Sequence, residues 1–471
     1  MNGLNYDGMG YDEYYDEHPY DPDDMFYDEL EVQPQTVRDT WTYCIQPSIA
    51  QISSYVATFL IWNFIFRITT TFLPVPVNVK HFFSITCGGA ILYLTMGIGS
   101  CYVFVLALTI YGILIGVRKF LRQHFGYIVA AFTIMYLVIG ELSQINAEQW
   151  HKLRGAQMVM VMKGISIGFD VDSKKLSQLP NFLESIGYLL CPSNSSLGPW
   201  IPYSEYAEIF KKNRRNSNFH WAYWIFVNVL ISVICVLCSN CLIAYFIADS
   251  SWKWITAYRD AMSYRFSHYF VTFLSQSMML MGGYQEEQNK VLGYTITKPW
   301  LIEVPRSLVG VVVVWNISMH RWLKAYVFRT LRKYGAFKAI LSTYVISTLL
   351  HGLSFPIAAV LLTLGVATYV EYRLRKSIAT IFDACVLANS CNQNCNHRHK
   401  WRHPAVLTAN VFFGILAMVH LTYLGVMFDA FAHADENGFS YQDTLDKWSS
   451  LYFLGHWLIF AFYILYYFIE N

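Results

Sequence analysis

Long apolar segments recur along most of this chain, and they constrain its fold more than any other feature. Hydrophobic residues make up 55% of the 471 positions and charged residues only 14%, a balance typical of proteins that cross a membrane several times. Each helical crossing needs about 20 apolar residues, because every backbone polar group in lipid must be satisfied within the protein. The apolar segments are residues 52–73, 82–115, 127–139, 221–248, 259–281, 308–315, 337–350, 357–370, 405–428 and 451–469. They predict an all-α fold, a polytopic transmembrane helical bundle of about 8–11 segments that include short and re-entrant helices.

The first 35 residues differ from the rest of the chain. They hold 11 acidic and no basic residues, and this charge, with few aliphatic side chains, predicts disorder. We therefore divide the chain into an acidic disordered tail (1–40) and a membrane-embedded domain (41–471), whose first apolar segment is expected to act as the targeting signal. The remaining chain carries 34 basic against 21 acidic residues. This excess of positive charge fits cytosolic loops under the positive-inside bias, and it would also attract the phosphates of acyl-CoA or anionic lipid headgroups. Nothing in the sequence supports nucleic-acid binding.

Two long segments carry polar side chains that lipid would not tolerate. Residues 150–172 include Arg154 and Gln157 among apolar runs. This pattern fits a helix inside the protein that faces a cavity, or alternatively an amphipathic helix at the membrane surface. Residues 259–281 include two arginines, Asp260, His268 and Gln276. We expect these side chains to point toward the protein interior.

Asn316 and His351 are the polar residues that stand out between Leu301 and Leu362. Asn316 ends an apolar run too short to span a bilayer, so the chain is expected to dip in and turn back there. His351 ends the apolar segment 337–350, and Pro356 follows and should break the helix. An ionisable residue within a membrane segment is by default a functional candidate. The alternative is a structural histidine that ties one helix to its neighbour.

These residues carry a resemblance to the membrane-bound O-acyltransferase family, which has an Asn followed a few dozen residues later by an intramembrane His. The matching motifs are WNISMHRWL at Trp315–Leu323 and TLLHG at Thr348–Gly352. Further matching stretches lie at Trp150–Asp172, Gly198–Tyr206, Thr297–Ser307, Asn316–Phe355 and Asp383–His399. The flanks are most similar to family members that attach palmitoleate to a serine of Wnt proteins.

The resemblance implies an activity and its setting. The protein is expected to be a protein-serine O-palmitoleoyltransferase of the endoplasmic reticulum membrane, with Wnt protein as acceptor and membrane lipids around it. Palmitoleoyl-CoA would be the co-substrate, and no cofactor would be required. A lipid O-acyltransferase acting on sterol or lysophospholipid is an alternative within the family. A transporter with His351 as a proton relay is an alternative from another class.

Acyl transfer from a thioester to an alcohol has two chemical demands. The alcohol must lose its proton as it attacks, and a neutral imidazole can accept that proton. Charge that develops on the carbonyl oxygen must be stabilised, and an amide side chain can do this or position the thioester. His351 as general base and Asn316 as the positioning or stabilising group fit these demands.

Five further residues are candidates for substrate binding. On a helix Tyr344 and Ser347 would share a face with His351, so this stripe could line the reaction chamber or make ordinary interhelical hydrogen bonds. Trp315 could form a wall of an acyl tunnel or belong to the core. Arg306 and Lys298 are candidates for acyl-CoA phosphates, although surface roles fit them equally.

The last constellation is a cysteine- and histidine-rich loop. Its ligand-type residues are Cys385, Cys391, Cys395, His397 and His399. These types suit Zn²⁺, but their spacing is tighter than in standard zinc fingers, so we take free thiols in a cytosolic loop as the preferred interpretation and predict no metal. Zinc, a disulfide and acylated cysteines remain alternatives.

The other cysteines and one sequon complete the sequence predictions. The cysteines show no secreted disulfide pattern, and those in apolar runs, Cys241 included, are expected to act as small hydrophobic residues. Residues 173–219 look like a loop and contain a glycosylation sequon at Asn194, which matters only on the lumenal side.

Overall fold

The computed structural model describes residues 36–120, 124–143, 147–211, 220–248, 252–284, 292–392, 395–428 and 441–471. Within these ranges the regular structure is helical, with one isolated β-bridge, which confirms the predicted all-α fold. Most of the predicted tail lies outside the described residues. Its last residues, from Thr36 to Thr40, form the capped first turn of a helix. The division into tail and membrane domain stays a prediction.

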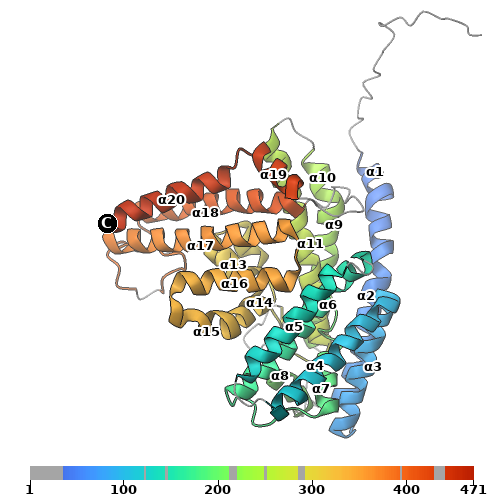
Figure 1. The fold of residues 1–471 in the computed structure, drawn as a ribbon. Coiled ribbons are helices and arrows are strands. Elements are labelled where there is room, and N and C mark those ends of the chain that lie inside the picture. The colour runs from blue at the N-terminus through green and yellow to red at the C-terminus, as the bar shows by residue number, and fades with distance from the viewer. Residues whose placement is uncertain are drawn as a thin grey trace, which may run out of the picture.

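The helices fall into three groups (Figure 1). One side of the bundle holds α1 (Val37–Thr40), α2 (Gln46–Arg67), α3 (Val77–Met96), α4 (Ser100–Phe120), α5 (Phe125–Leu142), α6 (Ala147–Asp172), α7 (Phe182–Leu189) and α8 (Tyr203–Lys211). The centre holds α9 (His220–Leu237), α10 (Ile243–Phe246) and α11 (Lys253–Met281). The other side holds α12 (Pro299–Glu303), α13 (Leu308–Trp315), α14 (Ile317–Trp322), α15 (Arg329–Leu331), α16 (Ala336–His351), α17 (Phe355–Ile381), α18 (Pro404–Gly425), α19 (Tyr441–Ser450) and α20 (Leu454–Glu470).

Short 3₁₀ or π segments adjoin several of these helices. They are η1 (Trp41–Ile45), η2 (Ile68–Phe72), η3 (Gly97–Gly99), η4 (Cys238–Leu242), η5 (Leu323–Phe328), η6 (Arg332–Tyr334) and η7 (Val426–Phe428). Helix α11 connects the three groups, because it packs against α2, α9 and α18.

Six helical runs in the described chain are long and apolar enough to cross a membrane. They are Val37–Phe72, Val77–Lys119, Phe125–Leu142, His220–Phe246, Phe355–Ile381 and Pro404–Phe428. The pair α19 and α20, bent by 72°, adds a seventh if it counts as one span. Large apolar side chains on the outside, such as Phe226, Trp457 and Phe468, are 63–74% exposed. Such a surface suits lipid rather than water.

The long run from α3 to α4 folds back on itself. Helix α3 ends at Gly97, whose φ of 59° is favourable only for glycine. A Cβ atom at Gly89 on α3 would lie 3.4 Å from the ring of Phe104 on α4, which requires the two helices to approach each other across the break. The apolar run is therefore two helices that fold back on each other and not one straight helix.

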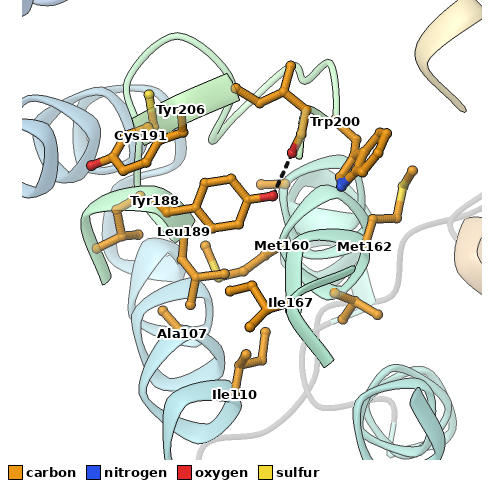
Figure 2. Close-up of a cluster of buried hydrophobic side chains, with 14 of the residues drawn as sticks. Ala107, Ile110, Met160, Met162, Ile167, Tyr188, Leu189, Cys191, Trp200 and Tyr206 are labelled. Carbon is orange, nitrogen blue, oxygen red and sulfur yellow. Dashed lines mark hydrogen bonds between the residues drawn. The ribbon is translucent and has the colours of Figure 1, made fainter. Parts of the chain in front are cut away.

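Helix α6 runs through the protein interior. Its second half, from Val159 to Val171, is buried except at Phe169, which is half-buried. Figure 2 shows Met160 and Ile167 of α6 on the side of α6 that faces α4 and α7, and Met162 beside Trp200. The predicted interior helix is confirmed, and the alternative of an amphipathic surface helix is wrong.

The segment predicted to be a loop, residues 173–219, instead contains α7 and α8 and a buried connection between them. The Tyr188 hydroxyl donates to the Ile201 carbonyl at 2.5 Å, which closes this connection (Figure 2). The ammonium of Lys163, fully buried, donates to the carbonyls of Tyr188 and Leu189 at 2.9 and 3.0 Å. It also donates to the side-chain oxygen of Asn194 at 2.7 Å. Asn194 is fully buried, so the folded structure leaves no room for a glycan on it.

One cysteine prediction is wrong. Cys241 is not a small hydrophobic residue of its apolar run but forms a disulfide with Cys44. The partners are 197 residues apart in sequence, and the bond joins the N-terminal helix to the end of the span that contains α9. No local pattern could have paired them, because the contact exists only after the helices have packed.

Candidate active site

Asn316 occupies a break between two short helices. Its backbone is extended (φ −143°, ψ 92°), so it ends α13 and begins α14. The apolar run thus ends in a helix break at Asn316, and the dip into the membrane and back stays a prediction. Its side-chain oxygen accepts a hydrogen bond from the Met319 backbone N–H at 3.0 Å and caps α14. With the oxygen held by this cap, the amide nitrogen is the end of the side chain left to donate to a substrate.

A buried polar network holds this break in place. The Ile317 N–H donates to the Ile296 carbonyl at 2.8 Å, and the Ile296 N–H donates to the Gln276 side-chain oxygen at 2.8 Å. The Gln276 amide nitrogen in turn donates to the Asn228 side-chain oxygen at 2.6 Å. The chain of contacts runs from α9 through α11 to Asn316, so Asn316 sits on a rigid support. The prediction that polar residues of α11 point inward is confirmed.

His351 is the last residue of α16 and lies at a sharp reversal of the chain. Gly352 follows with φ of 102°, and α17 starts three residues later with Pro356 in its first turn. The predicted break at Pro356 is confirmed. His351 is half-buried, and its ring nitrogens make no hydrogen bond within the described part of the chain. Its role as a general base stays a prediction.

Arg154 of α6 lies against this reversal. A Cβ atom at Gly352 would come within 2.6 Å of the Arg154 guanidinium, and the Arg154 charge acts on His351. Arg154 also donates to the carboxylate of Glu141, which accepts from the Trp150 indole at 2.8 Å. The Arg154 guanidinium of α6, held by Glu141 of α5, therefore lies next to the residue that follows His351.

His268 is a site residue to which the sequence assigned no role. Its Nε2 lies 3.0 Å from the Trp315 carbonyl oxygen, and its ring stacks on the Trp315 ring at 4.3 Å with an interplanar angle of 7°. His268 therefore packs against and supports Trp315, the residue before Asn316. Its polar character within an apolar segment was the only signal in the sequence.

The predicted stripe on α16 is helical throughout, so Tyr344, Ser347 and His351 share one face. The Tyr344 hydroxyl lies 3.3 Å from the Thr368 hydroxyl of α17, and its ring packs against Gly365. This is the interhelical contact that the sequence left as an alternative. Ser347 is buried beside it, and the role of the stripe in binding substrate stays a prediction.

The two predicted phosphate ligands lie in the segment before α13. Arg306 donates to the backbone carbonyls of Cys385 at 2.8 Å and Leu387 at 3.2 Å. Its guanidinium therefore holds a neighbouring loop. Lys298 is half-buried, and its backbone N–H donates to the Val314 carbonyl at 3.2 Å. A phosphate-binding role for either residue stays a prediction, as does the role of Trp315 as a tunnel wall.

Four of the five residues in the cysteine- and histidine-rich loop converge. The ligand atoms of Cys385, Cys391, Cys395 and His397 all lie within 4.8 Å of one another. His399 is not part of this group, because its ring packs against His403 at 4.6 Å. This cluster contacts Arg306, just before the start of α13, whereas Asn316 lies at the end of α13.

Similarity in sequence to known proteins identifies the family of this chain. The family profile described as MBOAT, membrane-bound O-acyltransferase family, matches residues 58–392. The chain belongs to the membrane-bound O-acyltransferase family. This acyltransferase is 35% identical over 468 residues to the protein-serine O-palmitoleoyltransferase porcupine of Anopheles gambiae, covering 92% of this chain and 94% of that protein.

Other relatives extend the comparison. The protein-serine O-palmitoleoyltransferase porcupine of Homo sapiens is 35% identical over 418 residues, covering 84% of this chain and 90% of that protein. The lysophospholipid acyltransferase 2 of Arabidopsis thaliana is 23% identical over 357 residues, covering 64% of this chain and 72% of that protein. With its apolar spans, this acyltransferase is a multi-pass membrane protein.

Proposed function

We propose that this acyltransferase moves a palmitoleoyl group from palmitoleoyl-CoA to a serine hydroxyl of Wnt proteins, in the membrane of the endoplasmic reticulum. The observation that carries the proposal is the similarity to protein-serine O-palmitoleoyltransferases over nearly the whole chain. The site geometry supports it, because an imidazole and an amide donor both occur at helix breaks inside a membrane protein.

In the proposed mechanism, His351 accepts the proton of the serine hydroxyl as the serine oxygen attacks the thioester carbonyl. The Asn316 amide nitrogen donates a hydrogen bond to the carbonyl oxygen as negative charge develops there. When the carbon–sulfur bond breaks, the protonated His351 returns the proton to the departing CoA sulfur. The products are a serine ester and free CoA, and the enzyme returns to its starting state.

Residues around the two reacting groups act as positioning residues. The Asn228–Gln276 network and the helix cap fix Asn316. His268 supports the residue before Asn316 through its contact with the Trp315 carbonyl. Such support matters because a displacement of about 1 Å in an active site can lower the rate about 10²-fold.

The test uses the purified full-length protein, palmitoleoyl-CoA and a Wnt-derived peptide that contains the acceptor serine. Ester formation is measured by mass spectrometry for the wild type and for His351→Ala. We expect the variant to lose transfer by at least the 10²-fold typical of a general base. His124→Ala is the matched control, because His124 is exposed and far from the site in sequence. Equal activity of wild type and His351→Ala would show that His351 is structural.

A lipid acceptor is the second candidate, and the similarity to a lysophospholipid acyltransferase favours it. The same assay with lysophospholipid or sterol in place of the peptide separates the two functions. We expect transfer to the serine peptide only. Transfer to lipid without transfer to peptide would replace the proposed acceptor while leaving the roles of His351 and Asn316 open to the same variants.

A further inference from the structure

The segment between α17 and α18 brings four metal-ligand side chains to one point. The sulfur of Cys385 lies 3.2 Å from the sulfur of Cys395 and 3.6 Å from Nδ1 of His397. The sulfur of Cys391 lies 3.7 Å from the same nitrogen. The four ligand atoms come from residues spread over a dozen positions of one loop, yet all lie within 4.8 Å of one another.

The two sulfur–nitrogen separations of 3.6 and 3.7 Å fit the edges of a zinc tetrahedron, and the sulfur–sulfur separation of 3.2 Å is somewhat shorter than such an edge. With Zn–S bonds of about 2.3 Å and Zn–N bonds of about 2.0 Å, ligand atoms around a tetrahedral Zn²⁺ lie about 3.5–3.8 Å apart. Three thiolates and one imidazole fill all four positions, which is the arrangement of a closed structural site. We propose that Cys385, Cys391, Cys395 and His397 bind one structural zinc ion, independently of the proposed acyl transfer.

The backbone around the cluster supports this ligand set and excludes His399 from it. The Cys385 N–H donates to the His399 carbonyl at 2.9 Å, and the His399 N–H donates to the Asp383 carbonyl at 2.9 Å. His399 thus holds the two ends of the loop together through its backbone while its ring turns to His403. The sequence, which included His399 among the ligand types, could not separate these two roles.

Two arginines, the half-buried Arg306 and the fully buried Arg375, hold the same loop against the bundle. Arg306 donates to the carbonyls of Cys385 and Leu387, and Arg375 of α17 donates to the carbonyl of Val386 at 2.8 Å. A Zn²⁺ ion with three thiolates and one neutral imidazole carries a net negative charge, which the nearby Arg306 guanidinium offsets, whereas Arg375 is paired with Glu371. The zinc ion would therefore help to hold this loop against the segment just before α13, the helix that ends at Asn316.

A disulfide is the main competing state for these thiols. The sulfurs of Cys385 and Cys395 are farther apart than the roughly 2.05 Å of a disulfide bond, and such a bond would leave Cys391 and His397 without a role. Zinc accounts for all four side chains at once. It also explains why a short loop brings three cysteine sulfurs within 4.8 Å of one another.

The test measures metal content in the full-length protein purified in detergent without chelators or metal-affinity steps. Zinc is counted by inductively coupled plasma mass spectrometry, and its release is followed after a mercurial reagent blocks thiols. We expect one zinc ion per wild-type chain. His397→Ala and Cys395→Ser should lose it, whereas the matched controls His399→Ala and Cys101→Ser should keep it; Cys101 is an exposed free cysteine elsewhere.

Two outcomes would overturn the proposal. Wild-type protein with well under one zinc ion per chain, or with a Cys385–Cys395 disulfide in peptide mapping, would show that the cluster is not a zinc site. Zinc that survives in both His397→Ala and Cys395→Ser would place the metal elsewhere. If a variant does not fold, the wild-type zinc content and thiol count still decide the question.

Discussion

Substitution of Asn316 separates its two roles, because one atom of the side chain caps a helix and the other is free to act on substrate. The oxygen accepts from the Met319 N–H at 3.0 Å, and the nitrogen is the proposed donor to the thioester. Asn316→Asp keeps an oxygen for the cap and nearly the same shape, but it removes the amide donor. Asn316→Ser keeps a neutral cap, and Asn316→Ala removes both functions.

The two roles have different magnitudes. Loss of a helix cap lowers stability by about 1 kcal/mol, and a carboxylate at a helix N-terminus is tolerated or favourable. Loss of a hydrogen-bond donor to developing negative charge lowers the rate about 10²–10³-fold, or about 2.7–4 kcal/mol in activation free energy. We therefore expect Asn316→Asp and Asn316→Ser to unfold like the wild type while their turnover falls steeply. Asn316→Ala should lose both.

The assay combines thermal unfolding in detergent with the rate of peptide acylation at saturating palmitoleoyl-CoA. The decisive comparison is kcat for the two cap-preserving variants against wild type. If both retain wild-type turnover, the amide nitrogen has no catalytic role and the function assigned to Asn316 is wrong. If turnover falls only in proportion to lost stability across all three variants, Asn316 acts through the fold alone.

Three further predictions test the packing around the site. Gly352→Ala places a Cβ atom against the Arg154 guanidinium at a φ of 102°. In thermal unfolding it should lower the free energy of unfolding by about 1–3 kcal/mol. Its control is Gly112→Ala, which has open space around it and should be neutral or slightly stabilising. Lys163→Ala removes a buried ammonium with three acceptors and should destabilise by about 3 kcal/mol; Lys175→Ala, whose side chain is 63% exposed, is the control and should change unfolding little. Mass spectrometry of protein from eukaryotic cells should find Asn194 without a glycan, and a deglycosylating enzyme should leave the protein mass unchanged. A glycan at Asn194 would contradict its burial.

Much of the site was predictable because it rests on local chemistry. An apolar run too short to span, ending at Asn316, indicates a break before any contact is known. The capping preference of asparagine then explains why the break becomes the start of a helix. His351 was predictable as a polar end to an apolar helix followed by glycine and proline. The inward face of α11 followed from the cost of placing charged side chains in lipid.

What the sequence by itself determined is the membrane-embedded helical bundle and the two breaks that carry Asn316 and His351, because hydrophobic length and helix-breaking residues act within a few turns of the chain. Tertiary structure alone decided three other features. It paired Cys44 with Cys241, buried Asn194 against Lys163, and turned His399 away from the cysteine cluster. Each depends on groups that meet only when helices distant in sequence pack or a loop closes, and no local periodicity records such a contact.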